Sequence, residues 1–252
     1  MKTFGILFCS VLMFCFSVSA KEVEGDNNYV KKSFRVDDFY KVKTNGAFNI
    51  VYHQSKDSAG LIKMYGEENI LNSMKVESKE GVLNIKFDSP SKKDFGVVIL
   101  DIFSSALNEV ENDGGAVFET GGHIAGSEVY FLLMGNGQIR TGELDYGIVR
   151  AKILTGSGDI FLKGNCRTAE LTITGGGEIK AHELKARDVK CKITGNATIG
   201  CFAEENLKAL ITGSGTVYYN GNPKIKKNAI GVKIILPAKN PRKVSLTTTT
   251  FE

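Results

Sequence analysis

After about residue 34, apolar and polar residues alternate in short runs, a pattern typical of β-strands that bury one face. Val42 and Thr44 alternate with lysines, and Ile85 and Phe87 show the same period of two. Residues 67–74 are predicted to form a short helical turn. No long run has helical periodicity, so the pattern predicts an all-β protein.

The second half of the chain carries a glycine-rich phrase that returns every 18 to 21 residues. Each copy reads Gly-x-Gly-polar-aliphatic, or a degraded form of it, and the copies begin at residues 135, 156, 175, 195 and 213. A fixed period of this length indicates stacked repeats, in which each unit buries its apolar face against its neighbours. In every copy an aliphatic residue stands four positions after the first glycine: Ile139, Ile160, Ile179, Ile199 and Val217.

A second aliphatic column lies two residues before the same glycines: Leu133, Leu154, Ile173, Ile193 and Ile211. The second copy is one residue longer than the others, which predicts a β-bulge near Ile153. Threonines directly before four of the glycines are expected to form an outward ladder: Thr155, Thr174, Thr194 and Thr212. A third, shorter face is marked by Leu144, Cys166 and Leu184.

These columns predict a single-stranded, right-handed parallel β-helix, or solenoid, with rungs of about 20 residues stacked about 4.8 Å apart. Its first rung is expected at 114–117, where the sequence reads Gly-Gly-Ala-Val. The open end of such a stack needs a cover, and the N-terminal β region is expected to cap it. A two-sheet sandwich is the alternative, although it does not require so constant a spacing.

The chain divides into five predicted segments. Residues 1–20 read as a signal peptide, with a lysine, an apolar stretch and a small-residue cleavage site. A polar leader (21–35), an N-terminal β region (36–100), the solenoid repeats (101–236) and a C-terminal tail (237–252) follow. No second apolar run of about 18 residues is present, so the mature chain should have no transmembrane helix. We therefore expect export to the periplasm or the cell surface.

Composition narrows the function classes. The chain has 32 Lys and Arg against 28 Asp and Glu, with the charges interspersed, which argues against a nucleic-acid-binding protein. After the signal peptide only Cys166, Cys191 and Cys201 remain, without CxxC spacing, so neither a zinc site nor a disulfide framework is indicated. Buried free thiols are expected instead. The 3 histidines are scattered, and no cofactor or metal is predicted.

The candidate binding residues lie in outward columns five and seven residues after the repeat glycines. Aromatic side chains there stand beside amides and cations, a combination that stacks on sugar rings or anchors a protein partner. The candidates are Phe161, Lys180, His182, Phe202 and Tyr218. The alternative is that the chain's own tail, from Ile225 onward, covers these aromatic residues.

A catalytic alternative rests on Asp159 and Glu178, which stand at equivalent positions of adjacent rungs. Their expected separation approaches the roughly 5 Å between the carboxylates of retaining glycosidases. Like charges at that distance would raise one pKa. The alternative is two solvated turn residues, and we expect no enzyme activity.

Several phrases together resemble the putative autotransporter adhesin head GIN domain family over roughly residues 36 to 230. They include the phrases at 46–52 (GAFNIVY) and 80–85 (EGVLNI), the Gly-x-Gly-Asp-Ile repeats, and the close at 213–224 (GSGTVYYNGNPK). The resemblance implies a secreted β-helical protein of bacterial envelopes, with adhesion suggested by the family name.

The sequence is thus interpreted as an exported, non-enzymatic cell-envelope protein, adhesin-like, that binds a glycan or a protein of the envelope or a host surface through one solenoid face. A polysaccharide-processing β-helix enzyme and a purely structural envelope component are the alternatives. A glycan array separates binding from structural roles, and product release from acidic polysaccharides identifies an enzyme.

Overall fold

The computed structural model describes residues 24–88, 95–230 and 234–237. The expected signal peptide (1–20) lies outside the described residues, as does the expected tail apart from its first residue, Pro237.

The described chain is nearly all β-strand, as the alternating pattern predicted. The predicted helical turn is present as α1 (Glu68–Asn72). The strands are β1 (Tyr29–Arg35), β2 (Lys41–Gly46), β3 (Asn49–Gln54), β4 (Leu61–Glu67), β5 (Met74–Lys79), β6 (Val82–Phe87), β7 (Ile99–Ser104), β8 (Glu109–Gly114), β9 (Val117–Thr120), β10 (His123–Gly135), β11 (Gln138–Thr155), β12 (Asp159–Gly175), β13 (Glu178–Gly195), β14 (Thr198–Gly213), β15 (Thr216–Asn220), β16 (Lys224–Ile230) and β17 (Ile234–Pro237).

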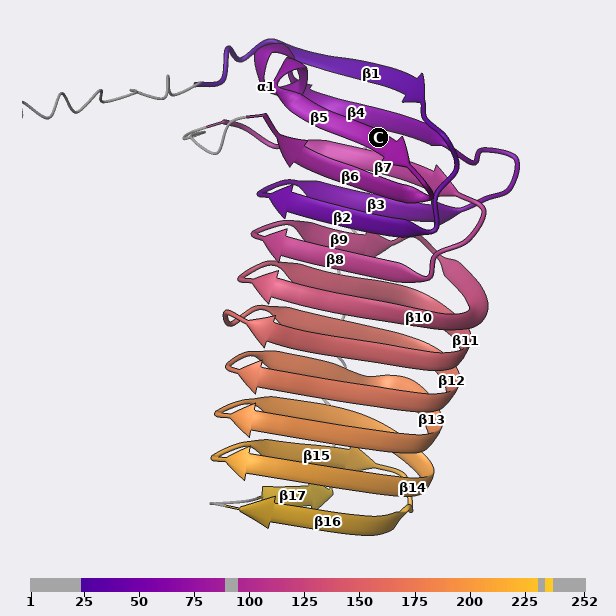
Figure 1. Ribbon diagram of the computed structural model, residues 1–252, viewed down its shortest axis with the longest axis vertical. Coiled ribbons are helices and arrows are strands. Elements are labelled where there is room, and N and C mark those ends of the chain that lie inside the picture. The colour runs from indigo at the N-terminus through magenta and orange to yellow at the C-terminus, as the bar shows by residue number, and fades with distance from the viewer. Residues whose placement is uncertain (1–23, 89–94, 231–233, 238–252) are drawn as a thin grey trace, which may run out of the picture.

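The strands form a stack of coils with two walls facing each other across the interior (Figure 1). The first, which we call the β8 wall, contains β6, β2, β8, the C-terminal halves of β10 to β14, and β16. The second, the β9 wall, contains β4, β7, β3, β9, the N-terminal parts of β11 to β14, β15 and β17. Glycine turns join the walls along one edge of the stack, and long strands bend around the other edge. This is the predicted parallel solenoid.

The interior is filled by the aliphatic columns that the repeat predicted. Ile160, Ile179 and Ile199 lie side by side on successive coils of the β9 wall and are fully buried. Ile173 and Ile193 do the same on the β8 wall. Each coil therefore buries its apolar residues against the coils above and below, which is why one repeat alone would not be stable.

The bulge in the second copy changes one member of that column. The pairing of β10 with β11 shifts between Leu133 and Met134, opposite Ile153 and Thr155. Ile153 consequently takes the interior position and is fully buried, whereas Leu154 is half-buried. The bulge near Ile153 is confirmed, but the assignment of Leu154 to the interior column was wrong, because the extra residue reverses the side on which it points.

The third face also needs a correction. Leu144 aligns with Gly164 and Leu184, whereas Cys166 aligns with Ala186, two residues further along the corner. Bulges at this corner change the number of residues between the walls, so counting from the glycines misplaced Cys166.

Glycine is required at the turns because successive coils approach closely there. Gly135 and Gly156 both have positive φ, at 121° and 86°. A Cβ at Gly156 would also collide with the carbonyl oxygen of Gly135 on the coil above. The recurring phrase thus reflects both a left-handed backbone conformation and the stacking of backbone on backbone.

The N-terminal region supplies a coil of the solenoid as well as a cap. β2 and β3 flank the turn at Gly46 and pair in parallel with β8 and β9, so that Gly46 lies beside Gly114. β6 and β7 lie beyond β2 and β3, so the order of coils differs from the order of the chain. The antiparallel strands β1, β4 and β5, with α1, then close this end.

Both chain ends of the described structure join the sheet. β1 pairs with β4, so residues 29–35 form a strand and not the polar leader that was expected over 21–35. β16 and β17 extend the stack by pairing with β14 and β15. The chain after Ile225 therefore continues the coil in the described residues and does not fold back over the outward face of β15.

Among the described residues, α1 is far too short to cross a membrane, and no other helix long and apolar enough to do so is found.

Candidate functional site

Three of the five candidate binding residues share one outward column of the β9 wall. Phe161 pairs with Lys180, Lys180 with Gly200, and Gly200 with Tyr218 on successive coils. Adjacent strands are about 4.8 Å apart, so the column extends over roughly 14 Å from Phe161 to Tyr218. Tyr218 keeps 37% of its surface exposed. We call this column, together with His182, the aromatic–cation strip.

The faces of the Phe161 ring are occupied by cations. The guanidinium carbon of Arg140 lies 5.6 Å from the ring centroid, and Nζ of Lys180 lies 4.5 Å from it. Arg140 and Lys180 come from the two strands that flank β12, so they lie on opposite sides of Phe161 in the column. Phe161 therefore offers its edge, flanked by the two cations, to a ligand.

The carboxylates of Asp159 and Glu178 lie on adjacent coils, in the register that the sequence predicted. Nζ of Lys180 lies 3.1 Å from Glu178 and 3.9 Å from Asp159. This ammonium supplies a counter-ion to both carboxylates. It thereby removes the uncompensated like-charge repulsion on which the catalytic alternative depended.

His182 reaches the strip from the corner. It belongs to a bulge in β13, where the pairing with β12 shifts between Phe161 and Lys163. Its imidazole lies against Gly200, where any Cβ would collide with the ring. Burial lowers the pKa of His182 below its ordinary value, although Glu178 and Glu183 act in the opposite direction. Its buried Nδ1 has no hydrogen-bond partner in the described structure.

Phe202 lies apart from this column. It is half-buried, pairs with Lys185 on one side and Asn220 on the other, and lies next to Gly221. The structure thus brings four of the five candidates together and places Phe202 on the neighbouring corner.

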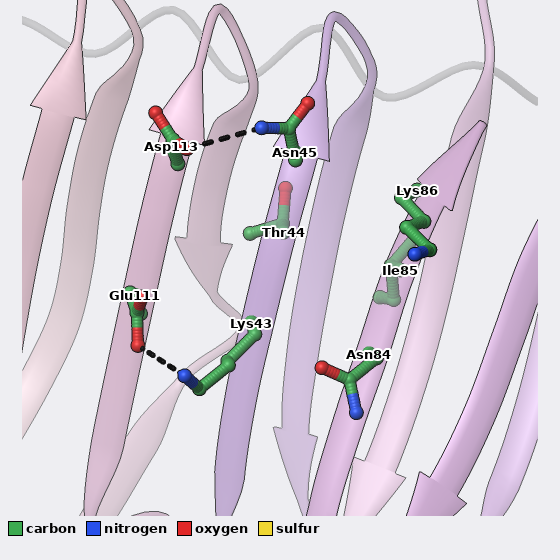
Figure 2. A pocket seen from close by; sticks show the side chains of 8 residues that line it. All are labelled: Lys43, Thr44, Asn45, Asn84, Ile85, Lys86, Glu111 and Asp113. Carbon is green, nitrogen blue, oxygen red and sulfur yellow. Dashed lines mark hydrogen bonds and ion pairs between the residues drawn. The ribbon is translucent and has the colours of Figure 1, made fainter. Parts of the chain in front are cut away.

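A second site lies on the opposite wall near the cap, and sequence reasoning missed it. A shallow hollow of about 160 Å³ crosses β6, β2 and β8 (Figure 2). Nζ of Lys43 lies 2.9 Å from Glu111, and Asn45 donates a hydrogen bond of 3.0 Å to Asp113. The hollow is lined by Lys43, Thr44, Asn45, Asn84, Ile85, Lys86, Glu111 and Asp113.

The β6 side of this hollow has free polar groups. Figure 2 shows Asn84 and Lys86 across from the Lys43–Glu111 and Asn45–Asp113 pairs. No hydrogen bond or ion pair of the Asn84 or Lys86 side chain is found within the described residues. The polar alternation of these strands was visible in the sequence, but their spatial order was not. In the chain β2 comes before β6 and β8, whereas in the sheet β2 lies between them.

No group of three or more His, Cys, Asp or Glu side chains suited to a metal ion is found in the part of the chain that the structure describes. Cys166, Cys191 and Cys201 are free thiols.

The fold and the site define the class of protein: a parallel β-solenoid whose two walls carry ladders of polar and aromatic side chains. Within this class, the model for the family described as "Putative auto-transporter adhesin, head GIN domain" matches residues 38–223. The chain belongs to this family.

Solved structures of the same fold come from species of Bacteroides and Parabacteroides. A putative adhesin from Bacteroides fragilis has a TM-score of 0.78 at 24% identity, with 86% of this chain and 100% of that chain covered. A putative adhesin from Parabacteroides merdae has a TM-score of 0.69 at 28% identity, with coverage of 87% and 100%. A putative lipid binding protein from Parabacteroides distasonis has a TM-score of 0.74 at 22% identity, with coverage of 87% and 100%. No match was found among curated protein sequences.

Proposed function

We propose that this chain is an exported, non-enzymatic binding protein of the bacterial cell envelope that acts as an adhesin. Its ligand is a glycan or a surface protein of the envelope or a host, bound through the aromatic–cation strip of the β9 wall. Membership of an adhesin family supports an extracellular or envelope location. The signal peptide expected at residues 1–20 supports export, to the periplasm or the cell surface.

The observation that carries this proposal is the composition of one straight column. An aromatic edge, an ammonium group, an imidazole and a phenol follow one another along the column, from Phe161 through Lys180 and His182 to Tyr218. Lys180 and His182 both belong to β13, and the imidazole lies at the place beside Gly200 of β14. Rigid strands hold these groups in place, so little conformational entropy is lost when a ligand binds. Aromatic groups with polar tips contribute much of the binding energy at recognition surfaces.

The enzymatic alternative is less well supported. Lys180 forms ion pairs with both Asp159 and Glu178, so the like-charge repulsion on which the catalytic hypothesis rested is compensated. A purely structural role is the remaining alternative.

The test is binding of the purified chain to a glycan array and to envelope fractions, repeated with a Phe161→Ala/Tyr218→Ala variant. We expect the variant to lose at least about tenfold in affinity, since each anchor at a recognition surface is worth more than about 1 kcal/mol. The matched control is Tyr40→Ala, which removes an aromatic side chain that is 48% exposed at the cap end of the other wall. Retained binding by the double variant, or equal loss by the control, would contradict the proposal; a wild-type chain that binds nothing would favour the structural role.

A further inference from the structure

The β8 wall changes its charge pattern along the stack. At the cap end the outward lysines of β2 have carboxylate neighbours on β8: Lys41 lies 2.6 Å from Glu109, and Lys43 lies 2.9 Å from Glu111. Partial burial opposes the charged form of Lys41, but these carboxylates raise its pKa above the ordinary value. Between β2 and β8 the wall therefore neutralises its own lysines.

The same alternation continues into the middle of the stack. Glu170 accepts hydrogen bonds from Lys190 at 2.8 Å and from Arg150 at 2.9 Å. Those two cations lower the pKa of Glu170, against the effect of its partial burial. Both carboxylate oxygens of Glu170 therefore already accept a hydrogen bond from a cation.

Beyond Lys190 the alternation stops. Lys190, Lys208 and Lys226 occupy the same outward column on the consecutive strands β13, β14 and β16. In the neighbouring outward column, Lys152 and Lys192 are separated by one threonine. We call these five residues the lysine strip. Apart from Lys190, none of them has an ion-pair partner among the described residues.

The lysine strip is energetically unfavourable for the isolated protein. Like charges directly opposite on neighbouring strands destabilise a sheet. The strip extends over four strand spacings, or about 19 Å, and is about 7 Å wide, the distance between alternate residues of a strand. Elsewhere on this wall, carboxylates lie beside the cations. In the lysine strip, a row of anions on a ligand would take their place.

A ladder of hydroxyl groups borders the lysine strip on one side. Thr174, Thr194 and Thr212 are aligned on successive coils, and all three are exposed. The sequence predicted this outward ladder with Thr155 as a fourth member. The structure confirms the alignment of the other three, whereas the register of β11 with β12 ends at Ile153 and Ile173. On the other side, Asp188 accepts a hydrogen bond of 2.6 Å from Asn206.

We propose that the lysine strip is a binding site for an acidic polysaccharide lying parallel to the long axis of the stack. The ammonium groups bind its carboxylate or sulfate groups, and the threonine hydroxyls form hydrogen bonds with its sugar hydroxyls. A long, narrow strip fits a linear polymer. A flat membrane surface fits less well, because its phosphates would also meet the carboxylate of Asp188. The site lies on the wall opposite the aromatic–cation strip and does not depend on it.

The experiment measures binding of the full chain to immobilised polygalacturonate and chondroitin sulfate, with neutral dextran as the reference polymer. The variant Lys192→Glu/Lys208→Glu/Lys226→Glu should bind at least tenfold more weakly. The control Lys31→Glu/Lys56→Glu/Lys79→Glu changes the net charge equally, at exposed lysines elsewhere, and should change affinity less than twofold. The variant Thr194→Val/Thr212→Val keeps every charge and should weaken binding about threefold or more.

Melting curves accompany each variant, and a Lys→Gln triple replaces the Glu triple should charge reversal prevent folding. Equal loss in both charge-reversal triples would show non-specific attraction and overturn the proposal, as would equal binding to dextran. Strip-dependent binding to phosphatidylglycerol vesicles without binding to either polysaccharide would also overturn it. The Phe161→Ala/Tyr218→Ala variant should retain polygalacturonate binding, which separates this site from the one proposed on the β9 wall.

Discussion

The imidazole of His182 lies against Gly200, at the position that a side chain on residue 200 would occupy. Residue 200 belongs to the outward column between Lys180 and Tyr218, so a glycine there leaves room for a ring that comes from a neighbouring bulge. The strip gains a neutral imidazole in this way, because burial lowers the pKa of His182.

Replacing Gly200 with alanine should expel the imidazole from this position. The ring would then be solvated, and the pKa of His182 would rise toward its ordinary value of 6.5. Titration of the imidazole protons by NMR measures this shift. Thr198→Ala, on the same strand and outward face, is the control and should leave the titration unchanged. An unaltered pKa in Gly200→Ala would show that burial by the Gly200 contact is not the cause.

His182 should also make the folded protein less stable in mild acid. Its folded-state pKa is lowered, so below pH 6.5 the unfolded chain binds a proton that the folded chain does not. The free energy of unfolding should therefore fall as pH decreases from about 6.5 through the folded pKa, and this contribution should be constant above 6.5. Urea unfolding of His182→Gln should show a smaller loss over this window than wild type. The exposed His123→Gln variant is the control and should keep the wild-type slope.

Two glycines at the same position of the repeat allow the cost of backbone strain to be measured apart from the cost of a collision between coils. Gly156 and Gly175 both have positive φ, at 86° and 101°, but a Cβ would meet the Gly135 carbonyl oxygen only at Gly156. Gly175→Ala should cost about 1 kcal/mol for its φ alone. Gly156→Ala should cost about 1–3 kcal/mol more, because the coils must move apart. Urea unfolding of both variants gives the two values; equal values would mean that the contact between coils adds nothing.

The interior of the solenoid was predictable because its chemistry repeats. Ile160, Ile179 and Ile199 recur at a near-constant distance after a glycine, and the stack needs an apolar residue at that place in every coil. The same regularity predicted the bulge at Ile153, since one additional residue cannot be absorbed without breaking the alternation. It could not show whether Ile153 or Leu154 would face inward, because that depends on where the pairing shifts.

The cap end was less predictable because the order of coils there is not the order of the chain. Thr44 and Asn112 lie side by side and fill interior positions that hold leucine or isoleucine in the coils beyond. Asn112 donates hydrogen bonds to the carbonyl oxygens of Ala116 at 2.7 Å and Gln138 at 3.3 Å, which fixes the adjacent turns. In an alternating strand pattern a polar residue is predicted to face outward. The sequence therefore does not indicate that Thr44 and Asn112 are buried.

For the candidate site, the residues on straight strands were predictable from the sequence and those at the corner were not. Strand alternation placed Phe161, Lys180 and Tyr218 outward, and the register aligns them in one column. The contact of His182 with Gly200 was not foreseen, because it depends on a corner bulge whose size varies between coils. The sequence analysis grouped Phe202 with these residues because it counted a constant number of positions from the glycine. The corner bulge changes that number, so Phe202 aligns with Lys185 instead.

The buried cysteines should be inert in the folded protein. Cys191 and Cys201 are 3% and 1% exposed, and contact with the Cys201 thiol together with burial raises the pKa of Cys191 well above its ordinary value. Burial also raises the pKa of the half-buried Cys166 to about 12. Because the thiolate is the reactive form, iodoacetamide at pH 8 should modify Cys166 slowly and Cys191 more slowly still. Burial should keep the reagent away from Cys201. In urea all three should react at the rate of an unhindered thiol. Mass spectrometry of the alkylated peptides measures each rate. Rapid labelling of Cys191 in the native protein, or a Cys191–Cys201 disulfide in protein purified without reductant, would contradict this prediction.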